Sequence, residues 1–205
     1  MAQMERFLRP TPTIDSDNPN ITEKAQKLIQ GQQPIAEKAR SIFYFVRDEI
    51  KYNPYMISEN IEDHRAGKIL ETREGFCVQK AVLLAALARA VDIPARLRLA
   101  DIRNYLVPDK LQKLMQTNLF VYHGYNELYI DGKWVKATPT FDLNMCQDNR
   151  LIPVEFDGKN NATFHPYNLD GKLHIEYVND HGWYDDVPFD DMFKAIFETY
   201  GPRTD

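Results

Sequence analysis

The segment from Cys77 to Val91 is the feature that most constrains how this chain can fold. It is rich in alanine and leucine and apolar on most of its sides, whereas a helix at a protein surface is apolar along one stripe only. Asp92 and then Pro94 follow it, and proline cannot continue a helix. The sequence therefore predicts a buried helix over 77–91, against which the other elements must pack.

Two helices are expected before this buried one. The first runs from about Thr22 to Ile29 and stops near Gly31. The second opens with Pro34, a residue that suits the first helical turn, and it carries an apolar stripe at helical spacing. The residues of that stripe are Ile35, Ala39, Ile42, Phe43, Phe45 and Val46. Residues 1–20 are polar and rich in turn formers, so we expect an arm draped over the domain.

From about Leu119 the apolar period changes to two, which is typical of β-strands. Asp131-Gly132 between the runs 119–130 and 133–138 predicts a tight hairpin. The other expected elements are a strand at 95–99, a short polar helix at 108–116, a hairpin around Asp170-Gly171 with return strand 172–178, and a closing helix at 188–200. Helices followed by antiparallel strands predict an α+β fold.

Length and composition restrict the class of protein. A chain of 205 residues fits one domain over 1–205, with an arm at 1–20, a core at 21–142 and strands with a helix at 143–205. The net charge of −5 provides no broad basic field for a nucleic acid or an anionic membrane. The start of the chain lacks an apolar signal core, so we expect a cytoplasmic protein. No cofactor is expected, and the scattered histidines make a metal site an unfavourable interpretation.

Cys77 stands at the start of the buried helix, directly after Gly75-Phe76. A thiol at a helix N-terminus meets the positive end of the helix dipole and unpaired N–H groups, and both favour the thiolate. The same N–H groups can bind the oxyanion that forms when a thiolate attacks a carbonyl. Taken alone, Cys77 is as well explained as a small apolar residue of the core. The second cysteine, Cys146, lacks a helix-start context, and we interpret it as structural.

A nucleophilic cysteine needs a base, and His123 is the best placed of the five histidines. It lies on the outgoing strand of the predicted hairpin, beside Gly124, which leaves space over the imidazole. The others stand in a charged run, before a proline, on an edge hairpin or in a turn.

With this pair the chain resembles the transglutaminase-like superfamily. The similarity covers about residues 36–142 and rests on IKYNP at 50–54, TREGFCVQKAVLLAAL at 72–87, IPAR at 93–96 and HGYNELYIDGKWV at 123–135. The resemblance implies a papain-like arrangement of Cys, His and Asp, with a buried nucleophile helix packed on an antiparallel sheet.

One position departs from the family pattern, in which an aspartate follows the histidine by fifteen residues. Position 138 is threonine here. If the hairpin pairing continues past Pro139, Asp142 lies diagonal to His123 and within side-chain reach. We therefore expect Asp142 to orient the imidazole. Thr138 or a water remains an alternative, and so does Glu127, which shares the strand face of His123.

The resemblance implies catalysis on amide or related acyl bonds through Cys77 and His123, with a peptide or protein amide as substrate, and the hairpin geometry adds Asp142 as the third catalytic residue. Hydrolysis is preferred to transfer because water is always present. Two alternatives stay open: a degenerate module that binds a peptide or protein without chemistry, and a thioester-dependent acyltransferase. The sequence does not specify the oligomeric state.

Overall fold

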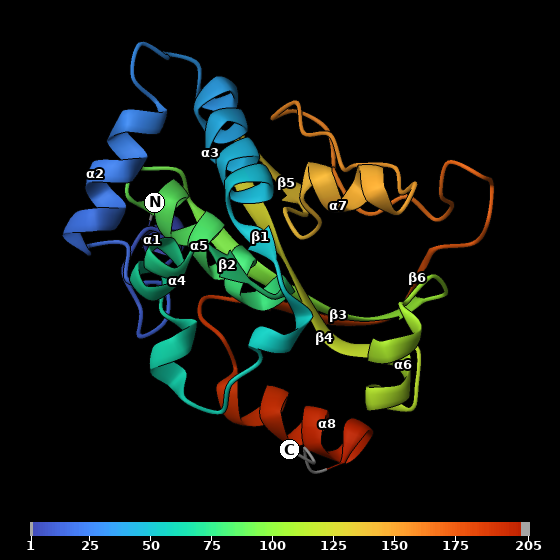
Figure 1. Ribbon diagram of the computed structural model, residues 1–205. Coiled ribbons are helices and arrows are strands. Elements are labelled where there is room, and N and C mark those ends of the chain that lie inside the picture. Colours follow the sequence, from blue (N-terminus) through green and yellow to red (C-terminus); the bar gives the residue numbers. More distant parts are fainter. Residues whose placement is uncertain (1, 202–205) are drawn as a thin grey trace.

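The computed structural model describes residues 2–201, and the predicted buried helix is its central element (Figure 1). This helix, α5 (Cys77–Arg89), is buried at every residue after Cys77. Helices α2 (Pro19–Leu28) and α3 (Ile35–Glu49) pack against it from one side, and the main sheet packs against it from the other. The expectation of a buried helix inside an α+β fold is confirmed.

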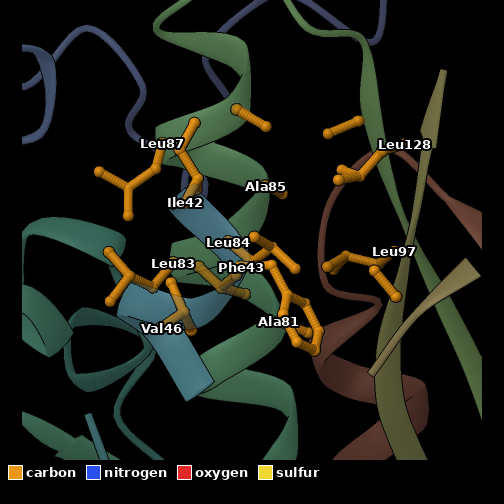
Figure 2. Packing of buried hydrophobic residues seen from close by; sticks show 14 of the residues in the cluster. Ile42, Phe43, Val46, Ala81, Leu83, Leu84, Ala85, Leu87, Leu97 and Leu128 are labelled. Atoms are coloured by element: carbon orange, nitrogen blue, oxygen red, sulfur yellow. The ribbon is translucent and has the colours of Figure 1, made fainter. Parts of the chain in front are cut away.

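The core lies where α5 meets its two neighbours (Figure 2). Phe43 of α3 approaches α5 from the helical side, while Leu97 and Leu128 approach it from the sheet. These three side chains and Leu84 of α5 have no exposed surface. Burying one side chain of this size stabilises a fold by about 1.5–3 kcal/mol, so this contact dominates the stability of the domain.

The main sheet has the strand order β5-β4-β3-β6, with every neighbouring pair antiparallel. Its strands are β3 (Ala95–Asn104), β4 (Leu119–Ile130), β5 (Lys133–Ala137) and β6 (Ile175–Tyr184). Asp131 and Gly132 both have positive φ, 48° and 85°, as a two-residue hairpin requires. The predicted hairpin is therefore confirmed, with Ile130 paired to Lys133.

The predicted hairpin around Asp170-Gly171 is confirmed at its turn but not as a two-stranded ladder. The chain reverses at Gly171 with one antiparallel bridge, between Tyr167 and Leu173, and the N–H of Asn168 donates to the carbonyl of Lys172 at 2.9 Å. The strand that follows, β6, pairs instead with β3 in the middle of the chain. A turn signal indicates where the backbone reverses, whereas the partner of the returning strand depends on which sheet edge is free.

The remaining elements surround this core. The helices α6 (Asp109–Met115) and α8 (Phe189–Tyr200) match the expected short and closing helices. The elements not foreseen are α1 (Ala2–Glu5), η1 (Pro54–Met56), η2 (Ile61–His64), α4 (Ala66–Thr72), α7 (Leu143–Asp148) and the parallel pair β1 (Lys51–Tyr52) and β2 (Glu74–Gly75). Figure 1 shows α8 beneath the start of α5, beside the η1–η2 segment and the ends of β3 and β4.

A buried lysine joins α3 to the nucleophile helix. Lys80, three residues after Cys77, has no exposed surface. Its Nζ donates to the carbonyl oxygens of Arg47, at 3.0 Å, and Ile50, at 2.6 Å. These carbonyls lie at the C-terminal end of α3, where helical partners are lacking, so Lys80 stabilises the junction from which β1 leads into the site.

Candidate active site

The start of α5 is fixed by contacts on both of its sides. Gln79 Oε1 accepts from the N–H of Phe76 at 3.1 Å, and Gln79 Nε2 donates to the carbonyl of Asp63 at 2.8 Å. Gly75 packs so tightly on Gln79 that an added Cβ would lie 3.0 Å from the Cβ of Gln79. Cys77 is thereby presented as the first residue of α5, and it is partly exposed, whereas Cys146 is buried.

The backbone near the Cys77 sulfur favours the thiolate. The backbone groups of Gly124, Val78 and Cys77 itself lower the thiol pKa, as expected at a helix start. Burial has the larger effect and raises the pKa of Cys77 to about 11. The expectation of a thiolate in the resting protein is therefore opposed by burial, because desolvation disfavours the charged form.

Strand β4 passes directly against the first turn of α5. A Cβ built on Gly124 would lie 2.8 Å from the Cα of Val78, which is a distance that real side chains do not reach. Only glycine permits this approach. The backbone of Gly124 is also close enough to the Cys77 thiol to lower its pKa, and His123 directly precedes Gly124 on β4.

The imidazole of His123 lies in an aromatic pocket. Its centroid is 5.0 Å from the ring of Phe164, 6.1 Å from Tyr125 and 6.3 Å from Tyr177. His123 is only 2% exposed, and Nε2 is buried without a hydrogen-bond partner among residues 2–201. Desolvation lowers the pKa of His123 to about 3. At neutral pH it is therefore an uncharged imidazole, able to accept a proton but poorly stabilised once it holds one.

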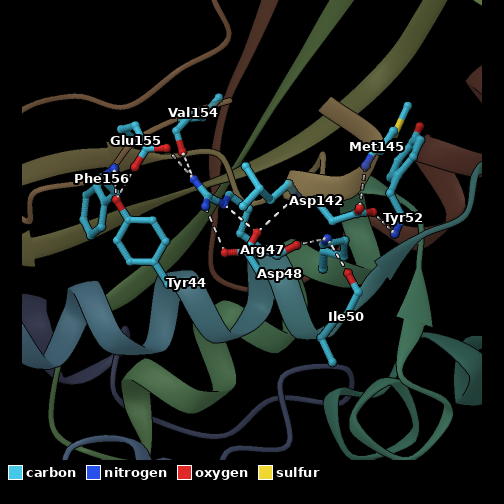
Figure 3. A network of polar contacts seen from close by, with 12 residues as sticks. Tyr44, Arg47, Asp48, Ile50, Tyr52, Asp142, Met145, Val154, Glu155 and Phe156 are labelled. Carbon is cyan, nitrogen blue, oxygen red and sulfur yellow. Dashed lines mark hydrogen bonds and ion pairs between the residues drawn. The ribbon is translucent and has the colours of Figure 1, made fainter. Parts of the chain in front are cut away.

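Asp142 has partners other than His123 (Figure 3). Its Oδ1 accepts from the N–H of Met145 at 2.9 Å and caps α7, while its Oδ2 accepts from the N–H of Tyr52 at 3.0 Å. The ladder between β4 and β5 ends at Ala137. Beyond it, Thr138 donates its N–H to Ala162 at 3.0 Å instead of continuing along β4. The extended pairing that motivated the assignment of Asp142 is therefore not formed.

The two alternative partners of the imidazole are Glu127, which is engaged elsewhere, and Thr138, whose hydroxyl is unpaired among the described residues. Glu127 lies on β4 but forms ion pairs with Arg96, at 2.6 Å, and Arg98, at 3.3 Å. Thr138 is buried, and its Oγ1 lacks a partner within the described chain. The Tyr177 hydroxyl is near it, since Thr138 contributes to lowering the Tyr177 pKa against the larger effect of burial, which raises that pKa.

Three tyrosines near the nucleophile were not singled out from the sequence. Tyr52 of β1, Tyr177 of β6 and Tyr200 of α8 are all close enough for the Cys77 charge to raise their pKa values, although burial is the larger cause in each. They come from three distant parts of the chain. Aromatic residues in a strand or an amphipathic helix are usually core residues, so no sequence signal singles out these three as neighbours of Cys77.

Neither a metal-binding cluster nor a membrane-spanning helix is present among the described residues. No group of three or more His, Cys, Asp or Glu side chains within 2–201 is arranged to hold a metal ion. None of the described helices has both the length and the apolar character needed to cross a bilayer.

Comparisons with known proteins place this geometry in context. The family model described as the transglutaminase-like superfamily matches residues 22–139. The solved structure of a candidate cysteine protease from Cytophaga hutchinsonii is similar at a TM-score of 0.59 and 19% identity, covering 94% of this chain and 50% of that one. The chain thus spans half the length of that protein. The periplasmic domain of TgpA from Pseudomonas aeruginosa has a TM-score of 0.47 and 20% identity, over 67% of this chain and 46% of that one. No curated protein matches the chain.

Proposed function

This chain belongs to the transglutaminase-like superfamily, and we propose that it is a cysteine-dependent hydrolase of amide bonds in a peptide or protein substrate. Cys77 is the nucleophile in this proposal, and His123 is the base. One observation carries it. Cys77 begins α5, β4 approaches the first turn of that helix so closely that only glycine fits at position 124, and His123 directly precedes Gly124.

The chemistry follows from the residues around the sulfur. As a substrate carbonyl arrives, the Cys77 thiol proton passes to His123 while sulfur bonds to the acyl carbon. The N–H groups at the start of α5 stabilise the oxyanion. The bond from carbon to nitrogen then breaks, and His123 returns its proton to the departing amine. Water, deprotonated by His123, then attacks the thioester. The bond from carbon to sulfur breaks, the acid is released, and His123 returns the proton to the Cys77 thiolate.

Resting Cys77 is a neutral thiol in this proposal, and substrate promotes its ionisation. A bound substrate replaces water in the cleft and brings a carbonyl to the N–H groups at the start of α5. Proton transfer to a neutral imidazole then accompanies bond formation instead of preceding it. The low pKa of His123, about 3, makes it a weak base, so the expected turnover is slow.

Turnover of fluorogenic peptide amides at pH 7.5 tests the proposal. The wild-type protein should release the amine and the free acid, and Cys77→Ala should release neither. His123→Ala should lower kcat/KM by about a hundredfold or more, the usual contribution of a general base. Cys146→Ala is the matched control and should retain the wild-type rate, because Cys146 lies buried in α7. Turnover that survives Cys77→Ala would exclude the proposed nucleophile.

A degenerate module that binds a peptide is the second candidate, and one observation favours it. The imidazole of His123 has no acceptor behind Nε2 among the residues seen here. If the chain is such a module, Cys77→Ala should bind intact peptides as tightly as the wild type, and neither should form product. A peptide vinyl sulfone would then label Cys77 no faster than Cys146.

Hydrolysis and transfer are separated in the same assay by adding a primary amine such as glycine methyl ester. Hydrolysis predicts the free acid as the main acyl product. An acyl-amine product that grows in proportion to the amine would assign the chain to acyl transfer instead. Both products require the same Cys77 acyl-enzyme, so this arm tests the acceptor and not the nucleophile.

A further inference from the structure

The backbone directly before His123 adopts a conformation that tyrosine rarely adopts. Tyr122 has φ of +54°, in the left-handed region that is unfavourable for a residue with a Cβ. The pairing of β3 with β4 shifts register at this point, between Ala100, which faces His123, and Ile102, which faces Phe120. A β-bulge of this kind redirects the side chains beside it, and bulges are enriched next to active sites.

One carboxylate holds this bulge. Asp101 Oδ1 accepts from the N–H of Tyr122 at 3.0 Å. The same oxygen is 2.7 Å from Nε2 of His181 on β6, and Oδ2 accepts from Asn179 Nδ2 at 3.3 Å. Asp101 therefore binds strands on both of its sides. The Asp101 and His181 side chains are only 16% and 20% exposed, so these contacts are partly shielded from water.

The ring of Tyr122 is held as well as its backbone. It stacks on the imidazole of His181 with the centroids 4.2 Å apart and the planes 19° from parallel. In the pairing of β3 with β6, a register shift between Leu99, which faces Gly182, and Ala100, which faces Asp180, leaves His181 as the extra residue. Asp101 thus fixes Tyr122 twice, directly through its N–H and indirectly through His181.

The contacts of Asp101 with Tyr122 and His181 lie next in sequence to the proposed base, His123. Tyr122 is followed by His123 and then by Gly124, whose backbone lowers the pKa of Cys77. His123 has no polar partner of its own on Nε2 among the described residues. Its orientation therefore depends on the aromatic pocket and on the backbone that presents it. A change of φ at Tyr122 would rotate the following peptide and move both His123 and the Gly124 N–H.

We propose that Asp101 is a positioning residue for His123: by bonding the Tyr122 N–H and His181, it holds the left-handed bulge that presents the imidazole to Cys77. This inference rests on the proposed function, because it assigns a role in that same site. Asp101 touches neither substrate nor sulfur in this assignment. It acts through the backbone of Tyr122.

A double-mutant cycle on peptide-amide turnover tests the assignment. Asp101→Ala should lower kcat about thirtyfold with KM within about twofold, because misplacement affects the chemical step more than binding. Asp101→Asn should retain activity within about threefold, since its amide oxygen still accepts the Tyr122 N–H. Asparagine adopts the left-handed conformation more readily than tyrosine. In a Tyr122→Asn background, therefore, the loss caused by Asp101→Ala should shrink to about threefold.

Hydrogen exchange supplies a readout that needs no activity. The amides of Tyr122 and Gly124 should exchange about tenfold or more faster in Asp101→Ala, and at the wild-type rate in Asp101→Asn. Equal losses in Asp101→Asn and Asp101→Ala, or an Asp101→Ala loss undiminished in the Tyr122→Asn background, would overturn the inference. Absence of turnover in the wild type contradicts the proposed function instead. The positioning role is then decided by exchange at Gly124, and an unchanged rate there overturns it.

Discussion

Asp142 and His123 are both buried polar residues near the nucleophile helix, but their hydrogen bonding is opposite. Each carboxylate oxygen of Asp142 accepts a backbone N–H, one from Met145 and one from Tyr52. The Nε2 of His123 has no partner in residues 2–201 and is enclosed by aromatic rings. The carboxylate expected to support the imidazole instead supports the backbone that leads into the cleft.

Asp142 and His123 show two ways of holding a buried polar side chain, by hydrogen bonds or by packing. Each oxygen of the Asp142 carboxylate has a backbone N–H donor, so the buried charge is stabilised without the imidazole. An unpaired imidazole is held by shape alone, so its proton affinity falls with desolvation and its pKa is about 3. Asp142 is therefore held by hydrogen bonds to the backbone, whereas His123 is enclosed by the rings of Tyr125, Phe164 and Tyr177.

The largest expected effect is on the pH dependence of Cys77 alkylation by iodoacetamide. Burial raises the Cys77 pKa to about 11. The reactive thiolate therefore increases about tenfold per pH unit, or about a thousandfold from pH 7 to 10, without levelling near 9. The measurement uses the Cys146→Ala protein, so that only Cys77 is labelled. A rate that is constant between pH 6 and 9 would indicate a preformed Cys–His ion pair and would contradict the description of His123 as an uncharged imidazole at neutral pH.

Removing the Asp142 carboxylate should have the next largest effect, and it acts on stability. Asp142→Ala loses the cap of α7 and leaves the N–H of Tyr52 without its acceptor, so it should destabilise the fold by about 3 kcal/mol, or about a hundredfold in the unfolding equilibrium. Chemical denaturation measures this. Asp142→Asn, which keeps the cap but replaces one accepting oxygen, should lose about half as much. If Asp142→Ala unfolds like the wild type but has lost turnover, Asp142 serves the imidazole after all.

The sequence predicted the two elements that carry Cys77 and His123 and missed what surrounds them. The helix at Cys77 and the hairpin at Asp131-Gly132 have strong local signals, an apolar run with a proline stop and a turn that demands positive φ. The Gly124 contact with Val78 was anticipated only as free space. Asp142 was misjudged because the register of a hairpin was extended through Pro139, and the sequence does not show where a ladder ends. Asp101 and His181 become neighbours only through a bulge, for which there was no sequence signal.

Supplying a carboxylate to His123 should raise activity by a smaller factor. Thr138 is the position at which the family pattern has aspartate, and its hydroxyl is buried beside the pocket of His123. Thr138→Asp should raise the pKa of His123 and increase kcat/KM about tenfold, because a charged acceptor stabilises the imidazolium. Thr138→Asn has the same shape without the charge and should gain about threefold or less. The kcat/KM of each variant is measured with the peptide amide at pH 7.5. The pKa of His123 is measured in the same proteins by NMR titration.

A folded Thr138→Asp protein whose His123 pKa stays near 3 would show that position 138 does not face the imidazole. A raised pKa without a gain in kcat/KM would show that the basicity of His123 does not limit the rate. Either outcome contradicts the inference that His123 differs from Asp142 because the imidazole lacks a hydrogen-bond acceptor.

The smallest effect concerns the unpaired hydroxyl itself. Thr138 Oγ1 is buried without a partner in the described part of the chain, so Thr138→Val should stabilise the protein by about 1 kcal/mol, or about fivefold in the folding equilibrium. Thr13→Val is a matched control, because Thr13 is equally buried but its hydroxyl donates to Asp186, and this change should destabilise. Urea denaturation of both variants compares the two signs directly. If Thr138→Val also destabilises, the hydroxyl forms a hydrogen bond in solution, to a water or to Tyr177. His123 is then supported by that hydrogen bond as well as by packing.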